Sequence, residues 1–226
     1  MKLLCPVIII IFLMGQNAYS QNKSNYEFDK LDSASSNYLI EMISQTPSEE
    51  NILMICGALK RIGQIKLACA RPEVRSVLDS STPSANQNRE KKTGHLRKVF
   101  NMAADTLGQI STNDIDASIL FQYYKEISDA ESRYWIVKAL GEMSGVKTAI
   151  LKLNSIIDNL TSQYKSQIDE RLIDELLNAI QYHNSKSSVL YLLKLQSRVR
   201  LSPDLNDKLN QTVNLLNSGG NMSSTN

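Results

Sequence analysis

Side chains that could carry out catalysis are scarce in this chain. Its two histidines, His95 and His183, lack the spacing to a cysteine that a metal site requires. The sequence contains no phosphate-binding glycine loop and no nucleophile motif. Paired acids such as Asp129 and Glu131 fall where they complement a helix dipole or pair with Arg171, outside any desolvated pocket. We therefore predict no catalytic residue, no metal site and no cofactor, and a protein that is not an enzyme.

Cys56 and Cys69 are the two side chains that could form a covalent crosslink. They are equally distant from Ile62-Gly63, where we expect the turn of a helical hairpin, and both fall on apolar stripes of the expected helices. Paired thiols in an oxidising compartment tend to form a disulfide, and this one would stabilise the fold by roughly 3 kcal/mol. The sequence thus predicts a Cys56–Cys69 disulfide, with two buried free thiols as the alternative.

Five aromatic residues lie within fifteen consecutive positions, from Phe121 to Trp135. Adjacent residues on a helix point about 100° apart, so one residue of each adjacent pair is expected near the surface. Tyrosine and tryptophan often anchor protein interfaces. The candidate partner-binding residues are therefore Tyr123, Tyr124, Tyr134 and Trp135. Ordinary packing between helices is the alternative interpretation.

A basic segment overlaps a polar stretch, residues 80–94, that has no apolar side chain larger than alanine or proline. This composition predicts a flexible loop. The segment could contact an anionic partner or be sensitive to proteases, but a solvated loop is the favoured interpretation. Its basic residues are Arg89, Lys91, Lys92, Arg97 and Lys98.

The overall composition excludes several classes of protein. The chain has 226 residues, a formal charge of +2, 42% hydrophobic residues and 3 cysteines. The apolar fraction is too high for a disordered chain, and the cysteines are too few for a disulfide scaffold. A nearly neutral charge also argues against nucleic-acid binding, which rests on clustered positive charge.

The N-terminus has the three parts of a cleavable signal peptide. Lys2 is followed by an apolar run from Leu3 to Met14, and Ala18 and Ser20 suit the positions before a cut. The run is shorter than the roughly 20 residues that a spanning helix needs. We predict a signal peptide over residues 1–20, a secreted or periplasmic location and no stable membrane insertion after cleavage, with an uncleaved anchor as the alternative.

Helical periodicity fills the chain between two polar ends. Residues 21–32 and 218–226 are polar and without period, and we expect both to be flexible or disordered. Between them, residues 33–217 show apolar stripes at spacings of three and four with no alternating strand. Capping boxes at Thr46–Glu49 and Ser128–Glu131 predict helix starts. The fold class is therefore predicted to be all-α.

A short pattern recurs at the ends of several of these helices. Leu107 and Leu140 are 33 residues apart, and Leu140 and Ile180 are 40 apart. Two helices joined by a turn cannot bury an apolar stripe alone, so we expect stacked antiparallel helical hairpins, a short α-solenoid. The pattern, clearest over residues 139–157, resembles the HEAT and armadillo repeats, and the resemblance extends over residues 47–200 as architecture. A compact helical bundle is the alternative.

These observations favour a binding role over a chemical one. The expected function is that of a secreted or periplasmic, non-catalytic module of helical repeats that binds or scaffolds a protein partner. The partner itself cannot be named from the sequence. The alternative is a compact helical bundle that binds a small apolar ligand or inhibits an extracellular enzyme.

Overall fold

Helices make up the structured part of this chain, and the fold class is all-α as predicted. The computed structural model describes residues 33–83, 90–162 and 169–218, and no strand occurs among them. The predicted signal peptide, the segment 21–32 and residues 219–226 of the tail lie outside these residues. The helices are α2 (Ser33–Ile43), α3 (Ile52–Gln64), η2 (Ala68–Ala70), α4 (Arg71–Ser80), α5 (Glu90–Ile110), α6 (Asp114–Glu126), α7 (Ala130–Glu142), α8 (Lys147–Ser162), α9 (Glu170–His183), η3 (Lys186–Ser188), α10 (Val189–Arg198) and α11 (Pro203–Asn217).

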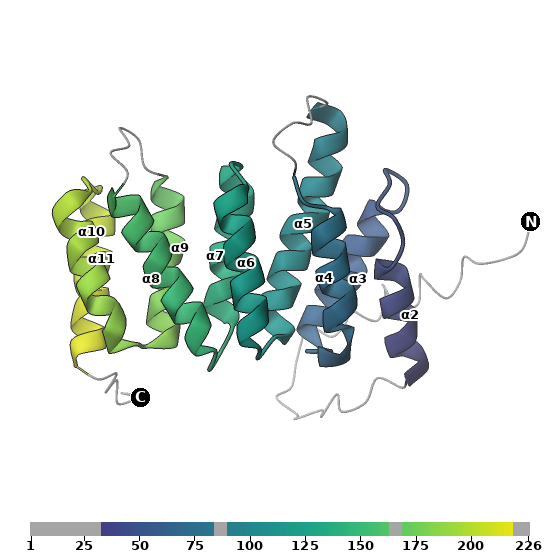
Figure 1. Ribbon diagram of the computed structural model, residues 1–226, viewed down its shortest axis with the longest axis horizontal. Helices are drawn as coiled ribbons and strands as arrows, with labels where there is room; N and C mark the ends of the chain where they lie inside the picture. Colours follow the sequence, from purple (N-terminus) through teal and green to yellow (C-terminus); the bar gives the residue numbers. More distant parts are fainter. Residues whose placement is uncertain (1–32, 84–89, 163–168, 219–226) are drawn as a thin grey trace, which may run out of the picture. The chain divides into compact units, whose positions relative to one another are not determined.

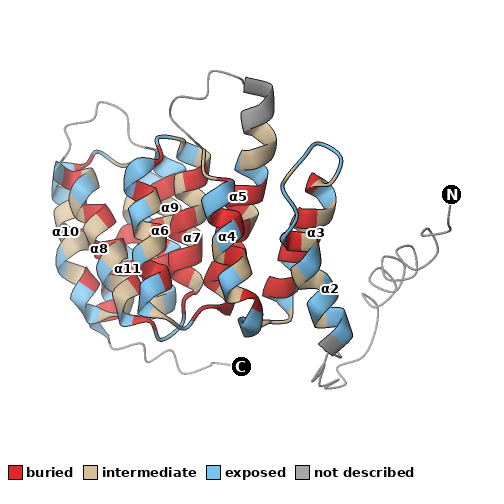
Figure 2. Ribbon diagram, turned by 45° about the vertical axis from the view of Figure 1, so that its right-hand side comes forward, coloured by how far each residue is buried: buried red, intermediate tan, exposed pale blue. Residues whose placement is uncertain are grey.

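Two layers of helices build the unit Asp32–Asn226 (Figure 1). In the first layer α3, α5, α7, α9 and α11 pack side by side in that order. In the second layer α8 lies between α6 and α10, and α4 packs on α5. Buried residues gather where the layers meet (Figure 2). Stacking thus buries the apolar side chains that a single pair of helices would leave exposed to water.

The recurring pattern marks the places where helices of the first layer come closest. Leu107, Leu140 and Ile180 are 0%, 0% and 1% exposed. A Cβ atom on Gly108 would lie 2.6 Å from the Cα atom of Ala139, so only glycine fits there. Gly141 of α7 meets α9 in the same way. The spacings of 33 and 40 residues therefore correspond to neighbouring helices in one layer.

Side-chain caps set several of the helix starts. The helix start predicted at Ser128–Glu131 is confirmed, but the N-cap is Asp129 and not Ser128: the Asp129 carboxylate accepts a hydrogen bond from the Ser132 backbone N–H. The capping box at Thr46–Glu49 is wrong, because α3 begins only at Ile52. The Asn51 side chain accepts a hydrogen bond from the Ser48 backbone N–H at 2.7 Å and donates one to the Thr46 carbonyl at 3.0 Å, which holds this segment in a turn.

The predicted Cys56–Cys69 disulfide is wrong: both cysteines are free thiols. The expected hairpin turn at Ile62-Gly63 lies within α3, which continues to Gln64. The chain then turns at Lys66, whose φ is 51°, and the returning helix α4 starts only at Arg71. Cys69 therefore lies exposed in the short connecting helix η2, while Cys56 is half-buried on α3.

The loop predicted over residues 80–94 is shorter than expected. Helix α4 ends at Ser80, but α5 already begins at Glu90, so residues 90–94 are helical. Glutamate and lysine are good helix formers, and one helical turn needs no apolar stripe when it simply extends a packed helix. Lys91 and Lys92 consequently belong to the first turn of α5, and Arg89 lies outside the described residues.

Candidate functional site

Tyr123 and Tyr124 lie on α6 in the second layer, and neither is a free anchor. The Tyr123 hydroxyl donates to the Asp79 carboxylate, and its ring packs edge-on against Phe100 with centroids 5.6 Å apart. Burial, together with the hydrogen bond to Asp79, raises the pKa of Tyr123 to about 12. Tyr124 is 6% exposed and stacks on Phe121 with centroids 6.5 Å apart. Both rings therefore serve packing.

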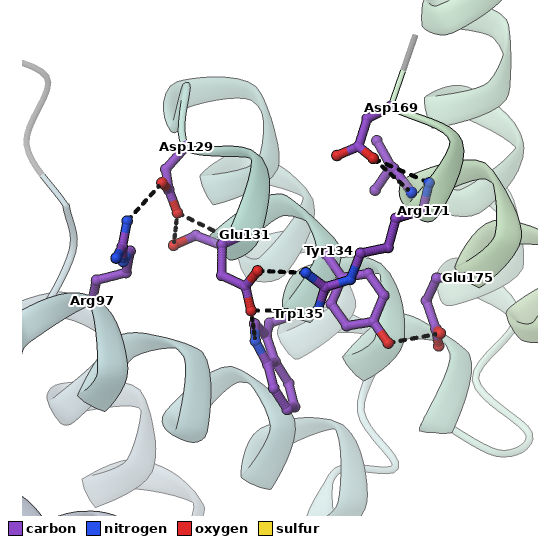
Figure 3. A network of polar contacts seen from close by, with 10 residues as sticks. Arg97, Asp129, Glu131, Tyr134, Trp135, Asp169, Arg171 and Glu175 are labelled. Atoms are coloured by element: carbon purple, nitrogen blue, oxygen red, sulfur yellow. Dashed lines mark hydrogen bonds and ion pairs between the residues drawn. The ribbon is translucent and has the colours of Figure 1, made fainter. Parts of the chain in front are cut away.

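Tyr134 and Trp135 lie on α7 in the first layer, and both remain partly exposed. Their rings meet edge-on with centroids 5.9 Å apart. The Tyr134 hydroxyl donates to Glu175 Oε2 on α9 at 3.2 Å, and Trp135 Nε1 donates to Glu131 Oε1 at 2.9 Å (Figure 3). The polar atoms of both rings are thus held by carboxylates while part of each side chain faces solvent.

Arg171 of α9 joins these residues into one network. Its guanidinium lies 4.1 Å from the centroid of the Tyr134 ring, and its Nη1 atom lies 2.7 Å from Glu131 Oε2 (Figure 3). The hydrogen bonds from Arg171 and Trp135 lower the pKa of Glu131. The hydrogen bond to Glu131 raises the pKa of Arg171. One carboxylate therefore binds an arginine and an indole and fixes their relative placement.

The helix N-termini surround this network with further charges. Asp129 caps α7 and also lies 3.3 Å from Arg97 of α5, joining Oδ1 to Nη1. Asp169 caps α9 by accepting from the backbone N–H of Arg171 at 3.1 Å and of Leu172 at 3.4 Å (Figure 3). These caps hold the first turns of α7 and α9, where Glu131 and Arg171 lie.

Lys138 extends the network from α7 toward α5. Its ammonium pairs with Asp105 and lies 4.7 Å from the Trp135 ring centroid. It also lies 3.4 Å from Glu142 Oε1. Burial and the nearby charge of Asp105 raise the pKa of Glu142. We call the resulting connected set the α5–α7–α9 polar surface: Asp105, Glu131, Tyr134, Trp135, Lys138, Arg171 and Glu175.

Sequence reasoning assigned only the aromatic members of this surface to binding, and it named Glu131 and Arg171 only as side chains that could pair with each other. The charged partners are separated by the repeat spacing itself: Lys138 follows Asp105 by 33 residues, and Arg171 follows Glu131 by 40. The two values equal the spacings between Leu107, Leu140 and Ile180. A search for opposite charges at those two spacings would have identified both pairs.

The predicted basic segment does not form one basic surface among the described residues. Arg97 and Lys98 are exposed on α5, but Arg97 pairs with Asp129. Lys98 lies near Cys56, where its charge partly offsets the rise that burial causes in the pKa of that thiol.

The two histidines contact residues other than those of the α5–α7–α9 polar surface. His95 Nε2 lies 3.5 Å from Glu49 Oε1, and His183 Nε2 donates to the Leu140 carbonyl at 2.9 Å. Within the described residues, no group of three or more His, Cys, Asp or Glu side chains is arranged to hold a metal ion.

Comparison of the chain with protein-family models, with curated proteins and with solved structures found no match. None of the helices in the described part of the chain is long and apolar enough to cross a membrane. The geometry of the site is therefore the basis for a functional proposal.

Proposed function

We propose that this protein is a secreted or periplasmic, non-catalytic binding module, and that it holds a protein partner on the α5–α7–α9 polar surface. Tyrosine, tryptophan and arginine are the residue types that most often carry binding energy at protein interfaces. The surface presents one of each within a single set of contacts, on three neighbouring helices of a stacked fold.

The observation that carries the proposal is the fixation of Arg171 between the Tyr134 ring and the Glu131 carboxylate. Its side chain is 57% exposed, so it is held in place while it still faces solvent. Binding costs less when interface side chains are already ordered. The contacts that join α5 to α7 and α7 to α9 thus form a preorganised surface with both charge signs, suited to a protein partner with mixed polar groups.

Site-specific photocrosslinking on the full chain tests this proposal. A photoreactive phenylalanine replaces Trp135 in one variant and Tyr182 in another, and each is exposed to the proteins of the native compartment. Tyr182 is a suitable control because it is a 65% exposed aromatic on α9 outside the polar surface. We expect a discrete crosslinked partner from position 135 and not from position 182.

Quantitative binding to the purified partner then tests the surface itself. We expect Trp135→Ala and Arg171→Ala each to weaken binding by about 30-fold or more, the effect of losing a strong interface anchor. Tyr182→Ala is expected to leave the affinity unchanged. Equal affinity of all three variants for the partner would contradict the proposed surface. Tyr124 is unsuitable for this test, because its burial makes substitution a test of stability.

A further inference from the structure

A second exposed surface lies on the other layer of the fold. Leu151 of α8 is 60% exposed, and Leu190 and Leu193 of α10 are 73% and 46% exposed. The two helices are neighbours, and Lys194 of α10 pairs with Asp158 of α8. Leu190 lies one helical turn before Lys194, and Leu151 lies two turns before Asp158. Both leucines therefore lie along the line where α8 and α10 contact each other. Water-exposed leucines on adjacent helices indicate a surface that something else covers.

The charges around these leucines are almost all positive. Helices α8, η3 and α10 contain a single acid, Asp158, and it is already paired with Lys194. Among the described residues, neither Lys147 nor Lys186 has a carboxylate within 4.0 Å. We call this surface the α8–α10 face. Its basic residues are Lys147, Lys186, Lys194 and Arg198, while Lys152 of α8 lies over the Phe121 ring of α6.

We infer that the α8–α10 face binds an acidic amphipathic helix of a partner protein. Such a helix presents a stripe of apolar residues at spacings of three and four to the exposed leucines, and its flanking glutamates or aspartates meet the lysines. Opposite charge on the two sides raises the rate of encounter and fixes the orientation of the bound helix. This inference uses a different layer from the α5–α7–α9 polar surface and does not depend on the function proposed for it.

The charge pattern favours this occupant over two others. A second copy of the chain docking through the same face would place lysines opposite lysines, because a twofold interface uses one patch twice. A flat anionic membrane would also touch α6, whose Asp114 carboxylate lies 3.3 Å from the backbone nitrogen of Thr148 on α8. Asp114 and Glu126 are both exposed on α6, and anionic headgroups would repel them. A helix that lies along α8 and α10 is narrower than a membrane surface and does not cover α6; of the two acids, only Asp114 contacts α8, at its first turn.

Binding of a designed peptide to the full chain tests the inference. The probe is a fluorescein-labelled synthetic helix of about five turns, with leucines on one face and glutamates on both flanks. A control peptide has the same composition in shuffled order. We expect saturable binding of the probe in the micromolar range by fluorescence anisotropy, and no saturable binding of the shuffled peptide.

Variants of the chain then locate the binding. Leu190→Asp and the double variant Lys147→Glu/Lys186→Glu are each expected to weaken binding about tenfold or more. Leu53→Asp is the matched control, since Leu53 is 85% exposed on α3 in the first layer, and it is expected to change nothing. All these side chains are exposed, and circular dichroism verifies that the variants remain folded.

Four results would overturn the inference. They are equal binding of the probe and the shuffled peptide, unchanged binding by Leu190→Asp, self-association through this face in sedimentation, and binding to phosphatidylglycerol vesicles without binding to the probe.

Discussion

Gly108 of α5 lies against the backbone of Ala139 of α7, so that a Cβ atom at position 108 would be 2.6 Å from both the Cα atom and the carbonyl oxygen of Ala139. Gly141 of α7 repeats this relationship with Ala179 of α9, at 2.7 Å to its Cβ atom. Because the obstacle at Gly108 is backbone, it cannot rotate away as a flexible side chain can. The missing side chains therefore set the spacing of α5, α7 and α9, and with it the distances across the α5–α7–α9 polar surface.

Gly108→Ala is expected to lower the free energy of unfolding by about 1–3 kcal/mol, since the added methyl forces α5 and α7 apart. Gly57→Ala is the matched control: Gly57 also lies within a helix, but a Cβ there would have no atom within 4 Å. Alanine is the better helix former, so the control is expected to gain up to about 1 kcal/mol. Urea denaturation measures the free energy of unfolding of both variants. Equal changes for Gly108→Ala and Gly57→Ala would contradict the close approach of α5 to α7 at Gly108.

The Asp116 carboxylate, 0% exposed, connects α4 to α6 through Arg75 and accepts a hydrogen bond from the Ser111 hydroxyl. Asp116→Ala is expected to lower the free energy of unfolding by about 3 kcal/mol, because it leaves the part-buried Arg75 without its partner. Asp207→Ala is the control, because Asp207 is an exposed acid on α11, and it is expected to change the free energy of unfolding by no more than about 0.5 kcal/mol. If urea denaturation gave similar free energies of unfolding for Asp116→Ala and Asp207→Ala, the contact between Asp116 and Arg75 would not contribute to stability.

The free energy of unfolding is expected to depend on pH because of His183. Burial lowers the pKa of His183 from 6.5, and its hydrogen bond to the Leu140 carbonyl offsets part of that decrease. The folded state therefore binds this proton less readily than the unfolded state, and the stabilisation is complete above about pH 6.5 and is lost as pH falls through the folded-state pKa. Thermal unfolding from pH 7 to 5 is expected to show a smaller loss of stability in His183→Gln than in the unchanged protein.

A second histidine variant separates this effect from general acid destabilisation. His95→Gln is the matched control, because it also replaces an imidazole with an amide but at a more exposed position. If His183→Gln and His95→Gln lost the same amount of thermal stability between pH 7 and 5, the buried His183 would not be the source of the pH dependence.

The two cysteines that the structure leaves free are expected to differ in reactivity. Burial raises the pKa of the half-buried Cys56, which decreases its reactive thiolate fraction, whereas Cys69 is exposed. Reaction of the native protein with a thiol reagent should therefore modify Cys69 first, and Cys69→Ser should remove the fast phase. Absence of any reactive thiol at positions 56 and 69 in protein denatured without reductant would contradict this prediction and would show that the two cysteines are bonded to each other.

Local patterns in the sequence were sufficient for the helices and some of their caps. Apolar spacings of three and four and a capping sequence act within one or two turns, so the sequence predicted α7 without knowledge of its neighbours, although it placed the N-cap at Ser128 and not at Asp129. The spacings between Leu107, Leu140 and Ile180 also agreed with the helices that pack together. The same reasoning failed at Cys69, because a single left-handed residue, Lys66, changed where the chain turned back.

The sequence by itself determined which segments are helical and where apolar stripes need cover, because those properties depend on residues a few positions apart. Only the tertiary structure decided that Tyr124 is buried while Trp135 remains partly exposed. Both are aromatic residues of neighbouring helices, but Tyr124 belongs to α6 in the second layer and Trp135 to α7 in the first, so their side chains meet different neighbours. It also brought Arg171 to Glu131 across 40 residues. That contact depends on the spacing of α7 and α9, which is set by how closely the two backbones approach at Gly141 and Ala179.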